Sequence, residues 1–333
     1  MKKTNLFLLG FIFALFFVAT SCSKDTDEPV VVNESMVLAQ YLESTSSPLQ
    51  KDFVNTDMPT IMPASEVKTL NETGQVYIMD IRSATDFATG HIANAHNVAF
   101  ADILTHIKGI TLANYTKVAI VCYTGQTAAY AASLLRIMGY DKVYSMKWGM
   151  CSWNSAFAGK WNTAITNGNA YASQFVTTAT EKGAKGVMPT LTTGKTTGQE
   201  ILEARIAVLL TEGFTPASIS NQAVFADLTA NYILNYWPAN HYALGHIPGA
   251  MQYTPKEAIK YAVDLTTLPT GKPVIVYCYT GQTSAFLAAY LRLLGYNAKS
   301  LLYGVNGMSY DMMVANNLTV FKADQIMGYD FVK

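Results

Sequence analysis

Charge is scarce in this sequence, and no basic cluster is present. Charged residues make up 14% of the 333 residues, and 23 Lys and Arg balance 23 Asp and Glu, for a formal net charge of +0. Binding to nucleic acid phosphates needs a surplus of Lys and Arg on one face. The composition therefore argues against nucleic acid as a partner.

Several common ligand motifs are also missing. The sequence has no phosphate-binding loop, no dinucleotide-binding glycine fingerprint and no cluster of metal-ligand residues. We therefore expect no cofactor and no metal ion. Any chemistry would then come from the side chains of the chain itself.

Cysteine is rare, and the number of cysteines argues against a disulfide framework. The four cysteines are Cys22, Cys122, Cys151 and Cys278. Cys22 falls in a predicted export signal, which leaves three thiols for the folded part. An odd number of thiols in an oxidising compartment does not make a disulfide framework. At least one thiol is expected to be free, and a free thiol in an exported protein calls for a functional reason.

The N-terminus is typical of an export signal. Lys2 and Lys3 precede an apolar run at 6–18, which is too short and too early for an ordinary membrane span. The Ala-Thr-Ser-Cys segment that follows resembles a bacterial lipobox, in which Cys22 would be lipidated. We expect a lipoprotein signal peptide over 1–22 and a location at the cell envelope, on the periplasmic face of the outer membrane or on the cell surface. The alternative is a plain secretory signal that is cut nearby.

The chain contains an internal repeat. Cys-Tyr-Thr-Gly-Gln-Thr at 122–127 recurs letter for letter at 278–283, and Gly-His-Ile at 90–92 recurs at 245–247. The nearly constant offset indicates a duplicated domain. We expect a tether and lead-in over 23–58, a first domain over 59–157, a connector with a lead-in helix over 158–212 and a second domain over 213–333.

Each copy alternates apolar strands with helical patterns. The predicted strands lie at 76–80, 118–121, 142–146, 232–235, 274–277 and 298–302, and the predicted helices at 127–138, 200–211 and 283–294. This alternation predicts an α/β fold with two tandem domains, each built on a mainly parallel central sheet flanked by helices.

Cys122 and Cys278 each stand between a predicted strand and a predicted helix. Ligands of open α/β sheets bind at the carboxyl ends of the strands. Gly125 and Gly281 allow the sharp turn into the helix, and the backbone N–H groups of such a turn favour an anion. We therefore expect each thiol to have a lowered pKa. The alternative is an inert, buried cysteine, but the same loop occurring twice favours a nucleophile.

These motifs, taken in order, resemble those of a tandem rhodanese-like (thiosulfate sulfurtransferase-like) lipoprotein of bacteria. The likeness rests on Asp-Ile-Arg at 80–82, on the Gly-His-Ile segment, on the Cys loop and on a strand leading to Trp148 and Gly149. It covers roughly 60–153 and 219–310. The resemblance implies a sulfurtransferase that moves a sulfane sulfur from thiosulfate or a persulfide to a thiol or cyanide. The sulfur would pass through a persulfide on Cys122 and on Cys278.

The resemblance also implies which residues surround each thiol. Asp80 would orient neighbouring groups, and Arg82 would help to position an anionic donor, unless the two form a surface ion pair. The remaining substrate-binding candidates are the loop residues Tyr123, Thr124, Gly125, Gln126, Thr127, Tyr279, Thr280, Gly281, Gln282 and Thr283.

Neither loop contains Arg or Lys, which leaves an organic persulfide or a protein donor as plausible as thiosulfate. The sixth residue after the cysteine is Ala128 in one copy and Ser284 in the other. Cysteine phosphatases carry an Arg there, which supplies a bidentate partner for phosphate. The loops therefore disfavour a phosphatase.

The second copy departs from the family pattern. Asn235, Trp237 and His241 replace Asp80, Arg82 and Asp86. We expect the first copy to handle anionic donors better, and the second to be slower, to take a more neutral donor or to receive sulfur from the first.

Two questions stay open at the level of sequence. Cys151 is either a packed thiol or a resolving partner of Cys122. The expected partners are a small sulfur donor, a thiol acceptor, a protein donor or acceptor, and the membrane through Cys22. The alternative function is a non-catalytic rhodanese-like binding or sulfur-carrier module.

Overall fold

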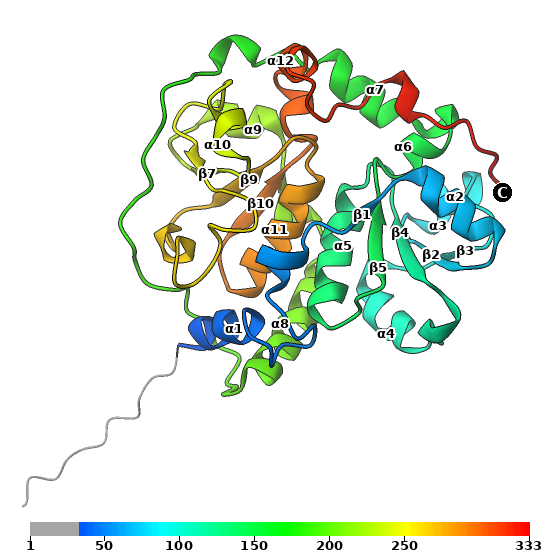
Figure 1. Cartoon of the computed structure of the whole chain (residues 1–333), viewed down its shortest axis with the longest axis horizontal. Coiled ribbons are helices and arrows are strands. Elements are labelled where there is room, and N and C mark those ends of the chain that lie inside the picture. The colour runs from blue at the N-terminus through cyan, green and yellow to red at the C-terminus, as the bar shows by residue number, and fades with distance from the viewer. Residues whose placement is uncertain (1–32) are drawn as a thin grey trace, which may run out of the picture. The chain divides into compact units, whose positions relative to one another are not determined.

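Two parallel five-stranded sheets organise the chain, as Figure 1 shows for the computed structural model, which describes residues 33–333. The strand order is β1-β5-β4-β2-β3 in the first sheet and β6-β10-β9-β7-β8 in the second. The strands are β1 (Ile61–Met62), β2 (Val76–Asp80), β3 (Ala95–Asn97), β4 (Lys117–Val121), β5 (Val143–Met146), β6 (Ser218–Ile219), β7 (Tyr232–Asn235), β8 (Met251–Gln252), β9 (Val274–Tyr277) and β10 (Ala298–Leu301). The identical order in both halves confirms the predicted tandem α/β fold.

Helices cover both faces of each sheet. They are α1 (Glu34–Leu42), α2 (Ala64–Glu72), α3 (Ala84–Thr89), α4 (Ile103–Lys108), α5 (Gln126–Ile137), α6 (Met150–Trp153), α7 (Gly159–Thr166), α8 (Gly198–Glu212), α9 (Asn221–Ala226), α10 (Ala239–Tyr242), α11 (Gln282–Leu293) and α12 (Tyr310–Ala315). The predicted signal peptide and Cys22 lie outside the described residues, as does the tether up to residue 32. Within 33–333, no helix is long and apolar enough to cross a membrane.

The central strands are apolar throughout because both of their faces are covered. Every residue of β2 and of β9 is buried, which is the pattern expected of parallel strands between two helical layers. The predicted strands and helices are confirmed to within a residue or two at their ends. The helix expected from residue 127 begins at Gln126, because Gly125 takes a left-handed conformation (φ 82°) and ends the loop there.

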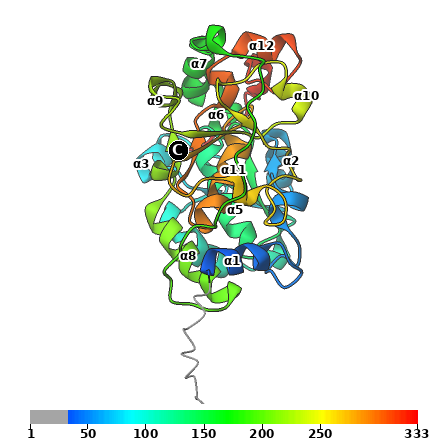
Figure 2. The ribbon, with the colours of Figure 1, turned by 90° about the vertical axis from the view of Figure 1, so that its left-hand side faces the viewer.

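Helices α5 and α11 pack against each other between the two sheets, and they lie side by side in both views (Figures 1 and 2). Nearly every residue of the two helices is buried, and one continuous hydrophobic core contains residues of both helices and of both sheets. Ser133 on α5 donates a hydrogen bond to the carbonyl of Phe286 on α11 at 3.0 Å. The two halves are therefore joined through the helices that follow the two Cys loops.

The halves also exchange their C-terminal segments. The backbone of Val332, at the end of the second half, pairs in both directions with His91 of the first half, at 2.8 and 2.9 Å. The backbone of Val176, just after the first half, pairs in the same way with His246 of the second half, at 3.0 and 2.9 Å. The red tail in Figure 1 follows this course from α12 toward the sheet of the first half. Each Gly-His-Ile segment is thus held by chain that follows the other copy.

The residues predicted as a connector, 158–212, contain more structure than expected. Helix α7 packs beside α6 of the first half, and the Trp161 indole N–H donates to the carbonyl of Thr124 at 3.1 Å. The segment around Phe175 then lies against Gly245 of the second half. The residues between the two repeats therefore pack against both halves. The polar, glycine-rich composition of this stretch gave no sign of that role.

Replacement of Phe331 by alanine is expected to destabilise the protein. The Phe331 ring packs edge-on against Phe157, with centroids 4.9 Å apart, and lies over Gly90. Loss of this half-buried ring should lower the free energy of unfolding by about 2 kcal/mol, as measured by urea denaturation. Val187→Ala, at an exposed position, is the control and should change the free energy by less than about 0.5 kcal/mol. Equal effects of the two substitutions would mean that the tail contributes no stability.

Candidate active site

The Cys122 thiol sits in a cradle of backbone N–H groups. The N–H groups of Gly125 and Ala128 donate to its Sγ at 3.2 and 3.3 Å. The thiol lies at the carboxyl end of β4 and at the N-terminus of α5, and the residue is only 5% exposed. The predicted anion-favouring turn is therefore present, and it faces the sulfur.

The expected lowering of the Cys122 pKa is wrong for this closed loop. Burial raises the pKa of Cys122 above its usual range, and it outweighs the backbone N–H groups of Ala128, Thr124 and Gly125, which lower it. The nearby Asp80 carboxylate raises it further. The loss of hydration on burial thus destabilises the thiolate more than the N–H donors stabilise it. Burial therefore favours the neutral thiol at Cys122.

Asp80 and Arg82 form a buried ion pair rather than a surface one. Nε of Arg82 lies 3.0 Å from both carboxylate oxygens of Asp80, and Nη2 lies 2.6 Å from Oδ2. Nη2 also donates to the carbonyl of Gly90 at 2.8 Å. The other terminal nitrogen, Nη1, is buried without a hydrogen-bond partner. The pair ties β2 to the Gly-His-Ile segment, and the buried Nη1 amino group has no hydrogen-bond partner in the protein.

Charged side chains surround Tyr123, which follows Cys122, and form the rim of the first site. The Arg82 guanidinium carbon lies 5.3 Å from the centre of the Tyr123 ring, and Nζ of Lys160 lies 4.3 Å from it. The Tyr123 hydroxyl donates to Asp86 at 3.1 Å. The Asp86 pKa is lowered mainly by a hydrogen bond from Ser83, so this carboxylate is charged at neutral pH. Tyr123 therefore lies beside two cations, Arg82 and Lys160, while the carboxylates of Asp80 and Asp86 bind Arg82 and the Tyr123 hydroxyl.

Cys278 occupies the equivalent cradle in the second half. The N–H of Ser284 donates to its Sγ at 3.3 Å, and the Sγ lies 3.5 Å from the Ser284 hydroxyl oxygen. That hydroxyl is 2.8 Å from the Ser300 hydroxyl, which in turn donates to the carbonyl of Gly281 at 3.1 Å. Ala128 has no counterpart to this hydroxyl, so the second cradle is the more polar at the position of the sixth loop residue.

The rim of the second site is neutral and aromatic. Trp237, which replaces Arg82, stacks on Tyr279 with ring centroids 4.8 Å apart. His241, which replaces Asp86, is hydrogen-bonded to the Tyr279 hydroxyl. Asn235, which replaces Asp80, has both side-chain polar atoms buried without a hydrogen bond. The two sites share a loop and differ in the charge around it.

The loop threonines and glutamines lie at different depths. Thr124 Oγ1 accepts from Nε2 of Gln126 at 3.1 Å, and Thr280 Oγ1 accepts from the backbone N–H of Gln282 at 3.2 Å. The side chains of Gln126 and Gln282 turn away from the thiols and form hydrogen bonds with the opposite half. Contact of these two glutamines with a substrate stays a prediction from the sequence. Thr127 and Thr283 lie in the first turns of α5 and α11 and are half-buried.

Cys151, His91 and His246 make contacts that stabilise the fold. Cys151 is fully buried, its thiol donates to the carbonyl of Phe157 at 3.1 Å, and burial raises its pKa to about 11. Those contacts fit the packed thiol rather than the resolving one. His91 and His246 each bond through Nδ1 to the carbonyl four residues earlier, at 3.0 and 2.9 Å. Both rings hold the Gly-His-Ile segment in place.

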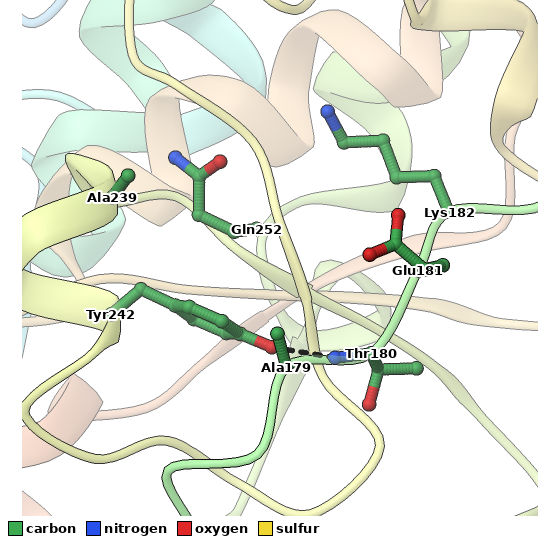
Figure 3. Close-up of a pocket in the computed structure, with 7 residues that line it drawn as sticks. All are labelled: Ala179, Thr180, Glu181, Lys182, Ala239, Tyr242 and Gln252. Atoms are coloured by element: carbon green, nitrogen blue, oxygen red, sulfur yellow. Dashed lines mark hydrogen bonds between the residues drawn. The ribbon is translucent and has the colours of Figure 1, made fainter.

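A separate cavity of about 340 Å³ lies between the connector and the second half. The Tyr242 hydroxyl, drawn in Figure 3, accepts the N–H of Thr180 there, at 3.1 Å. Lys182 at its wall is paired with Asp264 at 2.6 Å. None of the predicted site residues lines this cavity. Its lining residues are Ala179, Thr180, Glu181, Lys182, Ala239, Tyr242 and Gln252. Among residues 33–333, no group of three or more His, Cys, Asp and Glu side chains is placed to hold a metal ion.

Sequence reasoning missed Lys160 and Trp161. Both belong to α7, beyond the repeat boundary, and reach the Cys122 loop through Tyr123 and Thr124. The only sequence signal was a Lys-Trp pair directly after the predicted domain end, without a counterpart in the second copy.

Comparisons with known proteins identify the family of the repeated domain. A family model described as "Rhodanese-like domain" matches residues 63–156 and 222–310, more than half of the chain. The "Thiosulfate sulfurtransferase GlpE" of Pseudomonas fluorescens (strain SBW25) is 30% identical over 109 residues, which cover 33% of this chain and 94% of that protein. The protein of the same name from Shewanella oneidensis is 33% identical over 97 residues, which cover 29% and 94%. A solved rhodanese-like domain protein from Staphylococcus aureus is 25% identical with a TM-score of 0.25, over 28% of this chain and 88% of that one.

The chain therefore belongs to the rhodanese-like family, and it carries two copies of the family's domain. Its curated relatives above are thiosulfate sulfurtransferases by name.

The raised pKa of Cys122 leads to a pH prediction. A thiol reacts as its thiolate, so the rate of iodoacetamide alkylation at Cys122 should keep rising as the pH passes about 8.5, the ordinary thiol value. Peptide-level mass spectrometry in the Cys151→Ser, Cys278→Ser variant gives the rate at each pH, and free cysteine is the reference. A rate that levels off below pH 7 would show that the N–H cradle outweighs burial.

Proposed function

We propose that this protein is a sulfurtransferase in which Cys122 accepts a sulfane sulfur and passes it on, with Cys278 as a second carrier. The observation that carries the proposal is the cradle itself. The backbone N–H groups of Gly125 and Ala128 converge on the Cys122 sulfur, and that of Ser284 donates to the Cys278 sulfur, each at the end of a central strand. The same N–H groups are in position to stabilise the anion of a persulfide, which is one sulfur longer and reaches further toward the rim.

The reaction consists of two displacements. With thiosulfate as donor, the Cys122 thiol first loses its proton to water, and the thiolate attacks the outer sulfur. The S–S bond of thiosulfate breaks, sulfite leaves with the bonding electron pair, and Cys122 carries a persulfide anion. An acceptor such as cyanide or a thiolate then attacks the outer sulfur and returns the Cys122 thiolate. The enzyme's oxidation state is the same before and after the cycle.

The charge around the first site suits an anionic donor. The buried Nη1 of Arg82 has no partner in the protein, and Lys160 extends over Tyr123 from an exposed position. These groups supply the cations that the Cys loop lacks. In the second half, Trp237 and His241 stand in the places of Arg82 and Asp86, which favours a neutral donor. A protein donor and a protein acceptor are compatible with both sites.

One observation favours the alternative, a binding or carrier module, for the second half. Cys278 is 1% exposed and its rim is closed by the stack of Trp237 on Tyr279. A thiol that stays covered cannot exchange sulfur, so the second half would then act only as a binding module. The location at the cell envelope, through a lipid on Cys22, stays a prediction from the N-terminal sequence.

Intact-protein mass spectrometry tests the sulfur transfer. Incubation with thiosulfate or an organic persulfide should add one sulfur atom, and cyanide should remove it. Cys122→Ser should abolish the thiosulfate adduct, whereas Cys278→Ser should leave most of it. If folded protein gains no sulfur from either donor, the binding function takes precedence.

Lys160 gives a second test of the proposed function. We expect Lys160→Gln to lower kcat/KM for thiosulfate about three- to tenfold, because an exposed cation contributes a modest electrostatic attraction. The loss should shrink as salt concentration rises, and turnover of an uncharged persulfide should change little. Lys195→Gln, at an exposed position of the connector, is the charge-matched control. Equal losses for both variants, or for both donors, would contradict the role of Lys160.

A further inference from the structure

A glutamine in each Cys loop forms a hydrogen bond with the opposite half of the chain, close to the other Cys loop. Oε1 of Gln126, in the first loop, accepts the backbone N–H of Tyr303 in the second half at 2.7 Å. Oε1 of Gln282, in the second loop, accepts the backbone N–H of Trp148 in the first half at 3.2 Å. Both glutamines are almost fully buried. Each loop therefore makes a hydrogen bond across the interface between α5 and α11.

The two N–H donors to these glutamines lie in strained turns. Trp148 and Tyr303 both have φ of 63°, a left-handed conformation that is rare for large side chains. Such a conformation persists only where surrounding contacts impose it. The glutamine carbonyl is one such contact, since it binds the N–H of the strained residue itself.

Each strained turn lies directly behind a cysteine. The N–H of Met150, two residues after Trp148, donates to the carbonyl of Cys122 at 2.9 Å, and the N–H of Cys151 donates to the carbonyl of Tyr123 at 3.1 Å. In the second half, the N–H of Val305 donates to the carbonyl of Cys278 at 3.1 Å.

The packing behind the loops is equally close. A Cβ atom added to Gly149 would collide with the carbonyl of Cys122, and one added to Gly304 would collide with that of Cys278. Movement of either turn is thus transmitted to the backbone of the cysteine in front of it.

The aromatic packing joins the two turns. Trp161 lies edge-on to Trp148 of the first turn, with centroids 4.8 Å apart, and edge-on to Tyr303 of the second turn, 4.9 Å apart. Phe321 stacks on Trp161 from the C-terminal segment. The two turns, each behind a different thiol, therefore share one buried cluster.

We propose that Gln126 and Gln282 are positioning residues that act crosswise, so that Gln282 sets the accessibility of Cys122 and Gln126 sets that of Cys278. This coupling concerns the same two thiols as the proposed sulfur transfer and extends it, because the state of one loop then regulates the reactivity of the other. A persulfide that displaces one loop would pull its glutamine from the turn behind the opposite cysteine.

The test is a crossed pattern of alkylation rates. In Gln282→Met, which keeps the volume but removes the acceptor, Cys122 should react with iodoacetamide about three- to tenfold faster, since a buried thiol reacts after local opening. The rate at Cys278 should change less than about twofold in the same sample. Gln126→Met should give the mirror image. Peptide-level mass spectrometry of the full chain reports both thiols at once.

Controls separate positioning from general loosening. Ser133→Ala removes a buried hydrogen bond between α5 and α11 away from the loops and should leave both rates within about twofold. Thermal melting checks that each variant is folded, and Gln282→Asn, whose shorter amide cannot reach Trp148, serves if Gln282→Met does not fold.

Three outcomes would overturn the coupling: no change at either thiol, equal acceleration of both, or a larger effect of each glutamine on the cysteine of its own loop. Alkylation needs no sulfur donor, so a failure of sulfur loading alongside a crossed pattern would reject the transfer and leave the coupling standing.

Discussion

The contact between α5 and α11 is the constraint on which the rest of the structure depends. These helices fill the space between the two sheets, and their burial on all sides explains why their sequences are dominated by Ala, Leu and aromatic residues. Because each helix starts at a Cys loop, the same contact brings the two loops to one interface. Stability and the arrangement of the two candidate sites therefore rest on a single packed surface, and a substitution within it would affect both.

The two candidate sites share one loop conformation and differ in the side chains around it. The backbone turn after each cysteine is repeated almost unchanged, with φ of 82° at Gly125 and 79° at Gly281. The rim side chains come instead from the end of β2 and the residues after it, α3 and α7 in one half, and from the end of β7, the residues after it and α10 in the other. Ion pairs and cation–π contacts surround Tyr123, whereas aromatic stacking surrounds Tyr279. Divergence after duplication has changed the rim more than the backbone of the loop.

Much of the fold and part of the site could be predicted from the sequence. Apolar runs such as 76–80 and 274–277 reveal buried strands because the period of the pattern is local, and the letter-for-letter repeat locates both cysteines. Contacts between distant segments have no such local signal. The reach of Gln126 to Tyr303 and the position of Lys160 over Tyr123 depend on how the halves pack. The pKa of Cys122 was mispredicted for a related reason: the loop shows its N–H donors in the sequence, whereas its burial depends on the whole domain.

The exchanged C-terminal segments make the chain behave as a symmetric dimer that has been fused. Each copy is followed by a segment that pairs with the Gly-His-Ile segment of the other, so a chain cut between the repeats would leave both contacts dependent on a partner. Two separate copies related by a two-fold axis could satisfy the same contacts, as subunits do when they swap an element. Joining the copies in one polypeptide fixes their ratio at one to one, so the segment that pairs with each Gly-His-Ile segment is always present.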